Sequence, residues 1–178
     1  MQKDIIKQLI AKADKRRMLD RGSYLFHQND PVTSVYIVEE GLVELTRHQQ
    51  EGTSIVLQRA TCLTILAEAS LYSKVYHCDA VVILPSSVFE LPKVAFQKLF
   101  REDETFAYLW AAHLAREVQS ARFRSEILTR KTVAERLNGW LDWRGGKLPS
   151  KGQWKSIAAQ IGVSPEALYR ELAKRRSE

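Results

Sequence analysis

The hydrophobic positions in the first half of the chain follow two different periods. Residues 2–19 carry apolar side chains at helical spacing, which predicts a short amphipathic helix. From Gly22 onward, short runs rich in β-branched and aromatic residues alternate with turn residues, a pattern typical of strands. Strands are predicted at residues 23–26, 35–38, 42–47, 54–58, 79–84 and 88–91, with turns at 39–41 and 49–52. Their regular spacing predicts a small β-barrel or jelly roll.

After Pro92 the period becomes helical. A short helix is predicted over residues 93–100, and Asp103 with Glu104 opens a long one, since acids favour the positive end of the helix dipole. Along it, small and apolar residues recur at alternating spacings of four and three: Ala107, Ala111, Leu114, Val118, Ala121, Ser125 and Leu128. This period of 3.5 residues predicts a seam between two supercoiled helices, and therefore a homodimer through residues 103–128.

The alternative for this helix is a single copy that packs its stripe on its own domain. Three aromatic residues lie off the seam and are expected to cover the β-domain: Phe106, Trp110 and Phe123.

The last fifty residues predict an all-α domain over residues 129–178, with a helix at 132–143 and a helix-turn-helix at about 153–174. Ala158 is small enough for two helices to cross closely, and Gly162 supplies the positive φ of a tight turn. Ser164 is a good N-cap, and Pro165 suits the first helical position. Apolar pins between the helices are expected from Ile157, Ile161, Val163, Leu168 and Leu172.

The net charge of +6 is concentrated at this end of the chain. From Arg130 onward there are eleven Lys and Arg against five acids, so the remainder of the chain is neutral. A neutral body with one basic end favours binding to a polyanion. The alternatives are a solvated basic tail and a helical hairpin that only packs.

The second helix of this pair is expected to enter a DNA major groove. Glu166 can accept from the amino group of cytosine, and Arg170 can bind guanine O6 and N7 in bidentate fashion. Ser164 and Pro165 stand at the start of this helix, and Tyr169 can reach a base or a phosphate. Phosphate contacts are expected from Lys155, Lys174, Arg175 and Arg176.

These segments together resemble the Crp/Fnr superfamily of bacterial transcription regulators, over roughly residues 15–175. Residues 22–31 are similar to the family's G-x-x-L-F-x-x-G-D strand and turn, and residues 35–43 to the motif that follows it. Glu166 and Arg170 fall on the family's base-reading positions, whereas Pro165 stands where many members carry Arg, so the operator is expected to differ.

The resemblance implies an α+β protein with a cyclic-nucleotide-binding-like jelly-roll β-barrel at residues 1–102, a dimer helix at 103–128 and a DNA-binding domain at 129–178. It implies a palindromic double-stranded DNA operator as partner, and RNA polymerase as a further candidate partner.

The effector pocket departs from the family's pattern. The Gly-Glu pair that binds ribose reads Ala67-Glu68 here, and the Arg that binds the cyclic phosphate is replaced in the segment His77-Cys78-Asp79. A carboxylate facing a phosphate repels it, so cyclic AMP or GMP is not expected and the cofactor is unknown. An iron–sulfur cluster is not expected either, because no cysteine lies in the first sixty residues.

Two interpretations of His77-Cys78-Asp79 stay open. The segment is either a metal, haem or redox site, or a vestige of the pocket with a packed Cys78 and a hydrogen bond between His77 and Asp79. Cys62 is expected in the core. The remaining histidines, His27, His48 and His113, show no spacing typical of metal ligands.

Other features exclude whole classes of protein. No apolar run is long enough to cross a membrane and no secretory signal is evident, so the cytoplasm is the expected location. No Gly-rich phosphate loop, metal signature or nucleophile elbow points to an enzyme. The sequence thus predicts a transcription regulator, with a metal, haem, redox or small-molecule sensor acting through a protein partner as the alternative.

Overall fold

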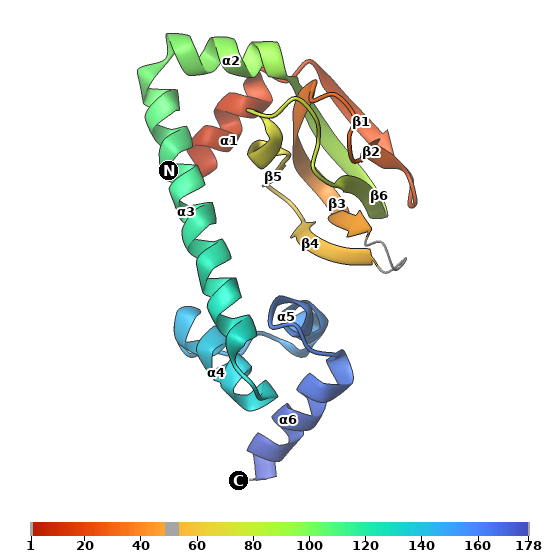
Figure 1. Cartoon of the computed structure of the whole chain (residues 1–178), viewed down its shortest axis with the longest axis vertical. Coiled ribbons are helices and arrows are strands. Elements are labelled where there is room, and N and C mark those ends of the chain that lie inside the picture. The colour runs from red at the N-terminus through yellow and green to blue at the C-terminus, as the bar shows by residue number, and fades with distance from the viewer. Residues whose placement is uncertain (1, 49–53, 178) are drawn as a thin grey trace. The chain divides into compact units, whose positions relative to one another are not determined.

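The computed structural model describes residues 2–48 and 54–177 (Figure 1). The chain divides into two compact units, of which the first ends at Ala112 and the second begins at His113. The helices are α1 (Gln2–Ala11), α2 (Lys93–Glu102), α3 (Glu104–Thr129), α4 (Val133–Trp143), α5 (Trp154–Gln160) and α6 (Pro165–Ser177), with 3₁₀ turns at Glu68–Ser70 and Lys151–Gln153. The strands are β1 (Lys15–Leu19), β2 (Tyr24–Phe26), β3 (Ser34–His48), β4 (Ser54–Ala60), β5 (Thr64–Leu66) and β6 (Asp79–Pro92).

The first unit is built on one antiparallel sheet of six strands. Its order is β1-β6-β3-β4, while β2 pairs with β6 and β5 pairs with β3. An antiparallel sheet with helices agrees with the predicted α+β class. The first and last strands of this order, β1 and β4, do not pair with each other among the described residues, so the predicted closed jelly-roll barrel is not confirmed. No helix within the described ranges is long and apolar enough to cross a membrane.

Two pairs of predicted strands are single long strands. β3 runs straight through the turn predicted at residues 39–41, and β6 joins the segments predicted at 79–84 and 88–91. The register of β3 against β6 shifts on both sides of Glu40, and Gly41 has a φ of +97°. A β-bulge accommodates a residue with positive φ, such as Gly41, without ending the strand. The turn predicted from Glu39-Glu40-Gly41 was therefore wrong. The turn predicted at residues 49–52 lies outside the described residues.

The predicted N-terminal helix is correct only as far as Ala11. Residues 15–19 form β1, which pairs with the last part of β6, so the prediction of helix up to residue 19 was wrong. Arg16 lies 2.7 Å from Glu39, and Arg17 lies 3.5 Å from Glu90. The backbone pairing of β1 with the distant strand β6, together with these side-chain contacts, overrides the local helical pattern.

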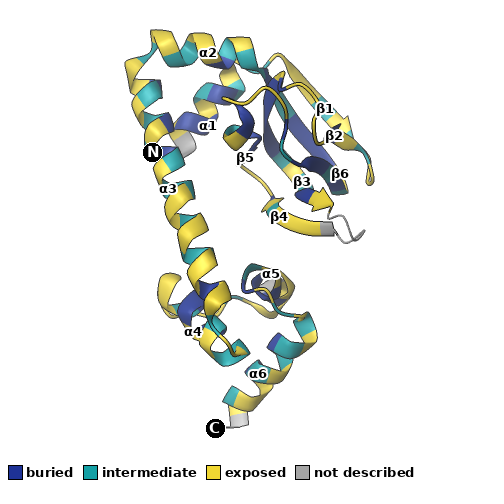
Figure 2. Cartoon of the chain, viewed as in Figure 1, coloured by how far each residue is buried: buried dark blue, intermediate teal, exposed yellow. Residues whose placement is uncertain are grey.

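Each unit has its own apolar core, and Figure 2 shows buried residues concentrated on the strands of the sheet. Phe106 and Trp110 of α3 are buried against Phe96 of α2, at ring distances of 5.7 and 4.6 Å. Phe123 was predicted to cover the β-domain, but its ring stacks on Trp143 of α4 at 4.8 Å. That prediction was wrong because α4 folds back onto α3 and takes this face.

The core of the second unit lies between the end of α3 and the last three helices. α4 begins with a capping box, in which Thr132 and Glu135 each bind the other's backbone N–H. Ile127 brings the end of α3 into the same core. The buried members are Ile127, Leu137, Trp140, Trp154, Ile157, Ala158, Ile161, Leu168 and Leu172.

Candidate nucleic-acid interface and effector pocket

A four-residue turn joins α5 to α6. Gly162 has a φ of +65°, as predicted, and the N–H of Val163 donates to the carbonyl of Ala158. Ser164 caps α6, because its Oγ accepts from the N–H of Ala167 at 3.1 Å. Pro165 is the first residue of α6, where its missing N–H costs nothing.

All five predicted pins lie in the core of the second unit. Ile157, Ile161, Leu168 and Leu172 are buried, and Val163 packs against them. Ala158 is fully buried. The inner face of α6 is therefore fixed, and its other residues are left to face solvent.

The exposed face of α6 carries the residues predicted to read DNA. Glu166, Arg170 and Lys174 follow one another at intervals of four and are all exposed, so they form one row on the helix. Ser164 and Lys155 are also exposed. Tyr169 differs, since it is half-buried with its ring 5.8 Å from that of Trp154.

Three of the arginines in this basic segment are engaged inside the unit. Arg175 is 2.7 Å from Glu171 and donates to the carbonyl of Ala134. Arg176 lies over the ring of Trp154, and Arg136 donates to backbone carbonyls. Sequence reasoning assigned Arg175 and Arg176 to phosphates. The i,i+4 spacing of Glu171 and Arg175 could have indicated their pairing, whereas Trp154 lies far from Arg176 in the sequence. Of these three, Arg136 and Arg175 are half-buried, whereas Arg176 is exposed.

The predicted seam of α3 is not buried within one chain (Figure 2). Ala107 and Leu114 are half-buried, and the other five seam residues are exposed. Val118 and Leu128 each retain 48% of their surface. The predicted dimer seam and its alternative, a helix that packs on its own domain, both stay predictions.

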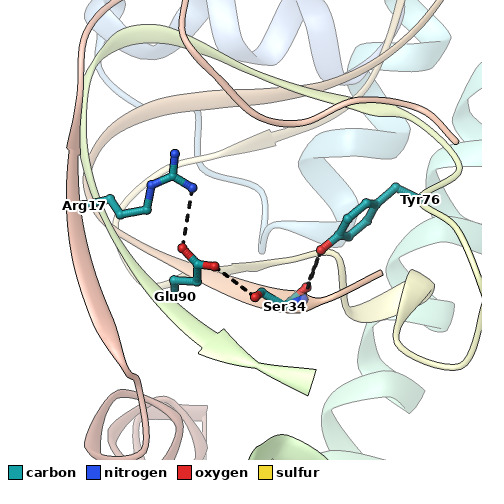
Figure 3. A network of polar contacts seen from close by, with 4 residues as sticks. All are labelled: Arg17, Ser34, Tyr76 and Glu90. Carbon is teal, nitrogen blue, oxygen red and sulfur yellow. Dashed lines mark hydrogen bonds and ion pairs between the residues drawn. The ribbon is translucent and has the colours of Figure 1, made fainter. Parts of the chain in front are cut away.

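Tyr76 directly precedes the segment His77-Cys78-Asp79, and its ring stacks on Phe26 at 3.8 Å. Figure 3 shows Tyr76 in a polar network with Ser34, Glu90 and Arg17. The Tyr76 hydroxyl accepts from the N–H of Ser34 at 3.1 Å and donates to its carbonyl at 2.8 Å. Ser34 Oγ donates to Glu90, which pairs with Arg17. This network fixes the residue directly before His77. Sequence reasoning missed it, because its members come from four distant segments.

His77 is half-buried and lies 2.7 Å from Ser70, measured between Nδ1 and Oγ. Burial, and then the nearby Arg47 guanidinium, lower the pKa of His77. Arg47 donates to the carbonyl of His77 at 2.9 and 3.1 Å. The imidazole is therefore neutral at neutral pH and offers an anion no permanent charge.

Asp79 does not pair with His77, so that predicted hydrogen bond was wrong. Asp79 accepts from the N–H of Gln28 at 2.8 Å, and it lies 3.4 Å from His27 and 3.6 Å from His48. The prediction assumed that a strand runs through His77, but β6 begins only at Asp79. His27 and His48 approach from other segments, where no sequence spacing signals them.

The two cysteines lie in opposite surroundings. Cys78 is buried, and burial raises the pKa of its thiol to about 11. Cys62 is exposed, so its predicted core position was wrong. Glu68 begins a 3₁₀ turn after Ala67, which has a left-handed φ of 70°. No cluster of three or more His, Cys, Asp or Glu suited to a metal occurs among the described residues.

Comparisons with known proteins agree with this architecture. The family model of the cyclic nucleotide-binding domain matches residues 16–103. The global nitrogen regulator of Synechococcus elongatus is 25% identical over 127 residues, which are 68% of this chain and 56% of the regulator. The chain thus spans little more than half the length of that relative.

Solved structures with the same fold match almost the whole chain. FixK2 from Bradyrhizobium japonicum has a TM-score of 0.71 at 20% identity, covering 92% of this chain and 84% of FixK2. The c-di-GMP-responsive global regulator CLP of Xanthomonas campestris has a TM-score of 0.66 at 18% identity, covering 98% of this chain and 92% of CLP. The predicted resemblance is therefore confirmed: residues 16–103 match the cyclic nucleotide-binding domain, and the chain is similar to transcription regulators of the Crp/Fnr type.

Proposed function

We propose that the chain is a DNA-binding transcription regulator of the Crp/Fnr type. The observation that carries this proposal is the exposed row of Glu166, Arg170 and Lys174 on α6, a helix whose opposite face is pinned in a core. In this proposal α5 and α6 are a helix-turn-helix and α6 enters the major groove. Glu166 and Arg170 then read base edges, while Lys174 and Lys155 contact phosphates.

The regulator acts as a homodimer through α3. Support comes from the seam residues, which have the period of a coiled coil and remain exposed or half-buried in a single chain. A two-fold dimer presents two recognition helices to successive major grooves, so its operator is a palindrome. Contact with RNA polymerase stays a prediction from the family resemblance.

The effector pocket in this proposal does not bind a cyclic nucleotide. His77 stands where the family has a permanent cation, and its Nδ1 is already engaged with Ser70. Glu68 and Asp79 both act on the neighbouring Cys78 as negative charges. A cyclic phosphate would meet these carboxylates without an arginine from this segment to offset them.

Selection from random double-stranded DNA tests the proposal. The wild-type chain should enrich a two-fold symmetric motif, and Arg170→Ala should bind that motif about 5- to 150-fold more weakly, because one bidentate base contact is lost. Arg101→Ala is the matched control, since Arg101 is an exposed arginine of the first unit. Enrichment of no motif by the wild-type chain would contradict DNA recognition and favour a sensor that acts on a protein partner.

A further inference from the structure

Arg136 binds the ends of two helices at once. Its Nε donates to the carbonyl of Arg130 at 2.8 Å, and its Nη2 donates to the carbonyl of Leu128 at 3.1 Å. Its Nη1 donates to the carbonyls of Ile161 and Gly162, at 3.2 and 2.9 Å. One guanidinium therefore joins the end of α3 to the turn between α5 and α6.

The chemistry of these acceptors explains why an arginine is needed. The last carbonyls of a helix have no partner within the helix and carry partial negative charge. Leu128 lies in the last turn of α3 and Arg130 directly follows this helix, while Ile161 and Gly162 directly follow α5. A planar guanidinium donates in several fixed directions, whereas the ammonium of a lysine is a compact point charge.

Side-chain packing reinforces the same junction. A Cβ added to Gly162 would lie 2.5 Å from Cδ2 of Leu128, so the turn rests directly on the last turn of α3. Ile127, one residue earlier, is 1% exposed in the core that holds Leu168 of α6. The end of α3 and the α5–α6 pair are therefore held together by polar and apolar contacts.

We propose that Arg136 is a positioning residue that fixes the angle between α3 and α6, and thereby the spacing of the two DNA half-sites that the dimer accepts. This inference rests on the proposed function. Arg136 donates to backbone carbonyls, so its proposed role is to position α6 and not to contact DNA. Since α3 is the dimer helix, its angle to α6 sets where the two recognition helices lie relative to each other.

The experiment compares Arg136→Gln with Arg175→Gln in the full-length chain. Both variants lose one arginine of the second unit, but Arg175 binds Glu171 of α6 and the carbonyl of Ala134 of α4. Affinity is measured on the selected palindrome and on versions with one base pair inserted or removed at its centre. One base pair moves the half-sites by about 3.4 Å and rotates them by about a tenth of a turn.

The wild-type chain and Arg175→Gln should lose about tenfold or more in affinity on the altered spacings. Arg136→Gln should bind all three duplexes within about threefold of one another, because its α6 takes several angles. If Arg136→Gln unfolds, Arg136→Lys replaces it in the experiment. Lysine keeps the positive charge but lacks the planar guanidinium that donates in several fixed directions. A spacing preference unchanged by either variant overturns the inference.

A second measurement does not depend on DNA. Spin labels at Arg122→Cys of α3 and Ala173→Cys of α6, in a Cys62→Ser background, report the distance between the helices, with labelled chains diluted into unlabelled ones. Arg136→Gln should broaden this distance distribution, and an unchanged distribution overturns the inference. If the wild-type chain binds no DNA, the proposed function fails, and the distance distribution alone decides whether Arg136 fixes the angle.

Discussion

At the scale of single residues, the burial of Cys78 bears on the two interpretations of the segment His77-Cys78-Asp79. A thiolate is the reactive form of cysteine, and a pKa of about 11 leaves Cys78 protonated at neutral pH. This favours a packed thiol over a redox or metal site. Cys62 is exposed on the same unit and serves as an internal comparison.

Thiol labelling checks this difference. With an aromatic disulfide reagent at pH 8, the native protein should expose one fast-reacting thiol, and the second should react only after denaturation. Cys62→Ser should remove the fast phase. Two fast thiols in the native protein would show that Cys78 is accessible and reactive.

The burial of His113 and the partial burial of His77 should make the free energy of unfolding depend on pH. Burial lowers the pKa of His113 and of His77 below the ordinary value of 6.5. The unfolded chain therefore binds more protons below about pH 6.5, so the free energy of unfolding should fall as the pH drops through this value. Above it, both groups are neutral in both states and contribute no slope.

Urea unfolding between pH 7.5 and 5.5 measures this slope, which cannot exceed about 1.4 kcal/mol per pH unit for each histidine. His113→Gln should flatten the profile relative to the wild-type chain. A profile with the same slope in the variant would mean that His113 titrates normally in the folded state.

At the scale of elements, local signals predicted the helices after Pro92 well, whereas the N-terminal helix is shorter than predicted. Ser164, Pro165 and Gly162 act within a few residues of one another, so their roles could be inferred from the sequence. The errors arose where distant residues decide. β1 forms where its backbone pairs with the distant end of β6, and Asp79 lies near His27 and His48 from other segments. A local sequence pattern does not show which distant segments will pair or meet in the fold.

The bulge at Gly41 provides a test at this scale. A Cβ at Gly41 would lie 2.5 Å from the carbonyl oxygen of Pro85, and its φ of +97° is unfavourable for other residues. Gly22 also has a positive φ, of +86°, but nothing lies within 4 Å of its Cβ position. Gly22→Ala should therefore cost only backbone strain of about 1–3 kcal/mol.

Gly41→Ala should cost a further 1–3 kcal/mol or so, because the methyl group also overpacks β6. Urea denaturation at constant pH compares the two variants. Equal losses of stability would indicate that β3 and β6 separate easily at the bulge.

At the scale of the whole molecule, α3 crosses the boundary between the two units and ends in the core that supports α6. A change in the first unit that shifts α3 would therefore act on α6 through this core. In the proposed regulator, this helix joins dimerisation to DNA binding. The coupling requires two copies, since one chain presents only one recognition helix.

Native mass spectrometry of the purified chain, alone and with a duplex of the selected site, tests the central claim most directly. We expect a dimer in the absence of DNA and a complex of two chains with one duplex in its presence. Extra mass on the dimer would identify a bound effector. A monomer that forms no complex with the duplex would contradict the account.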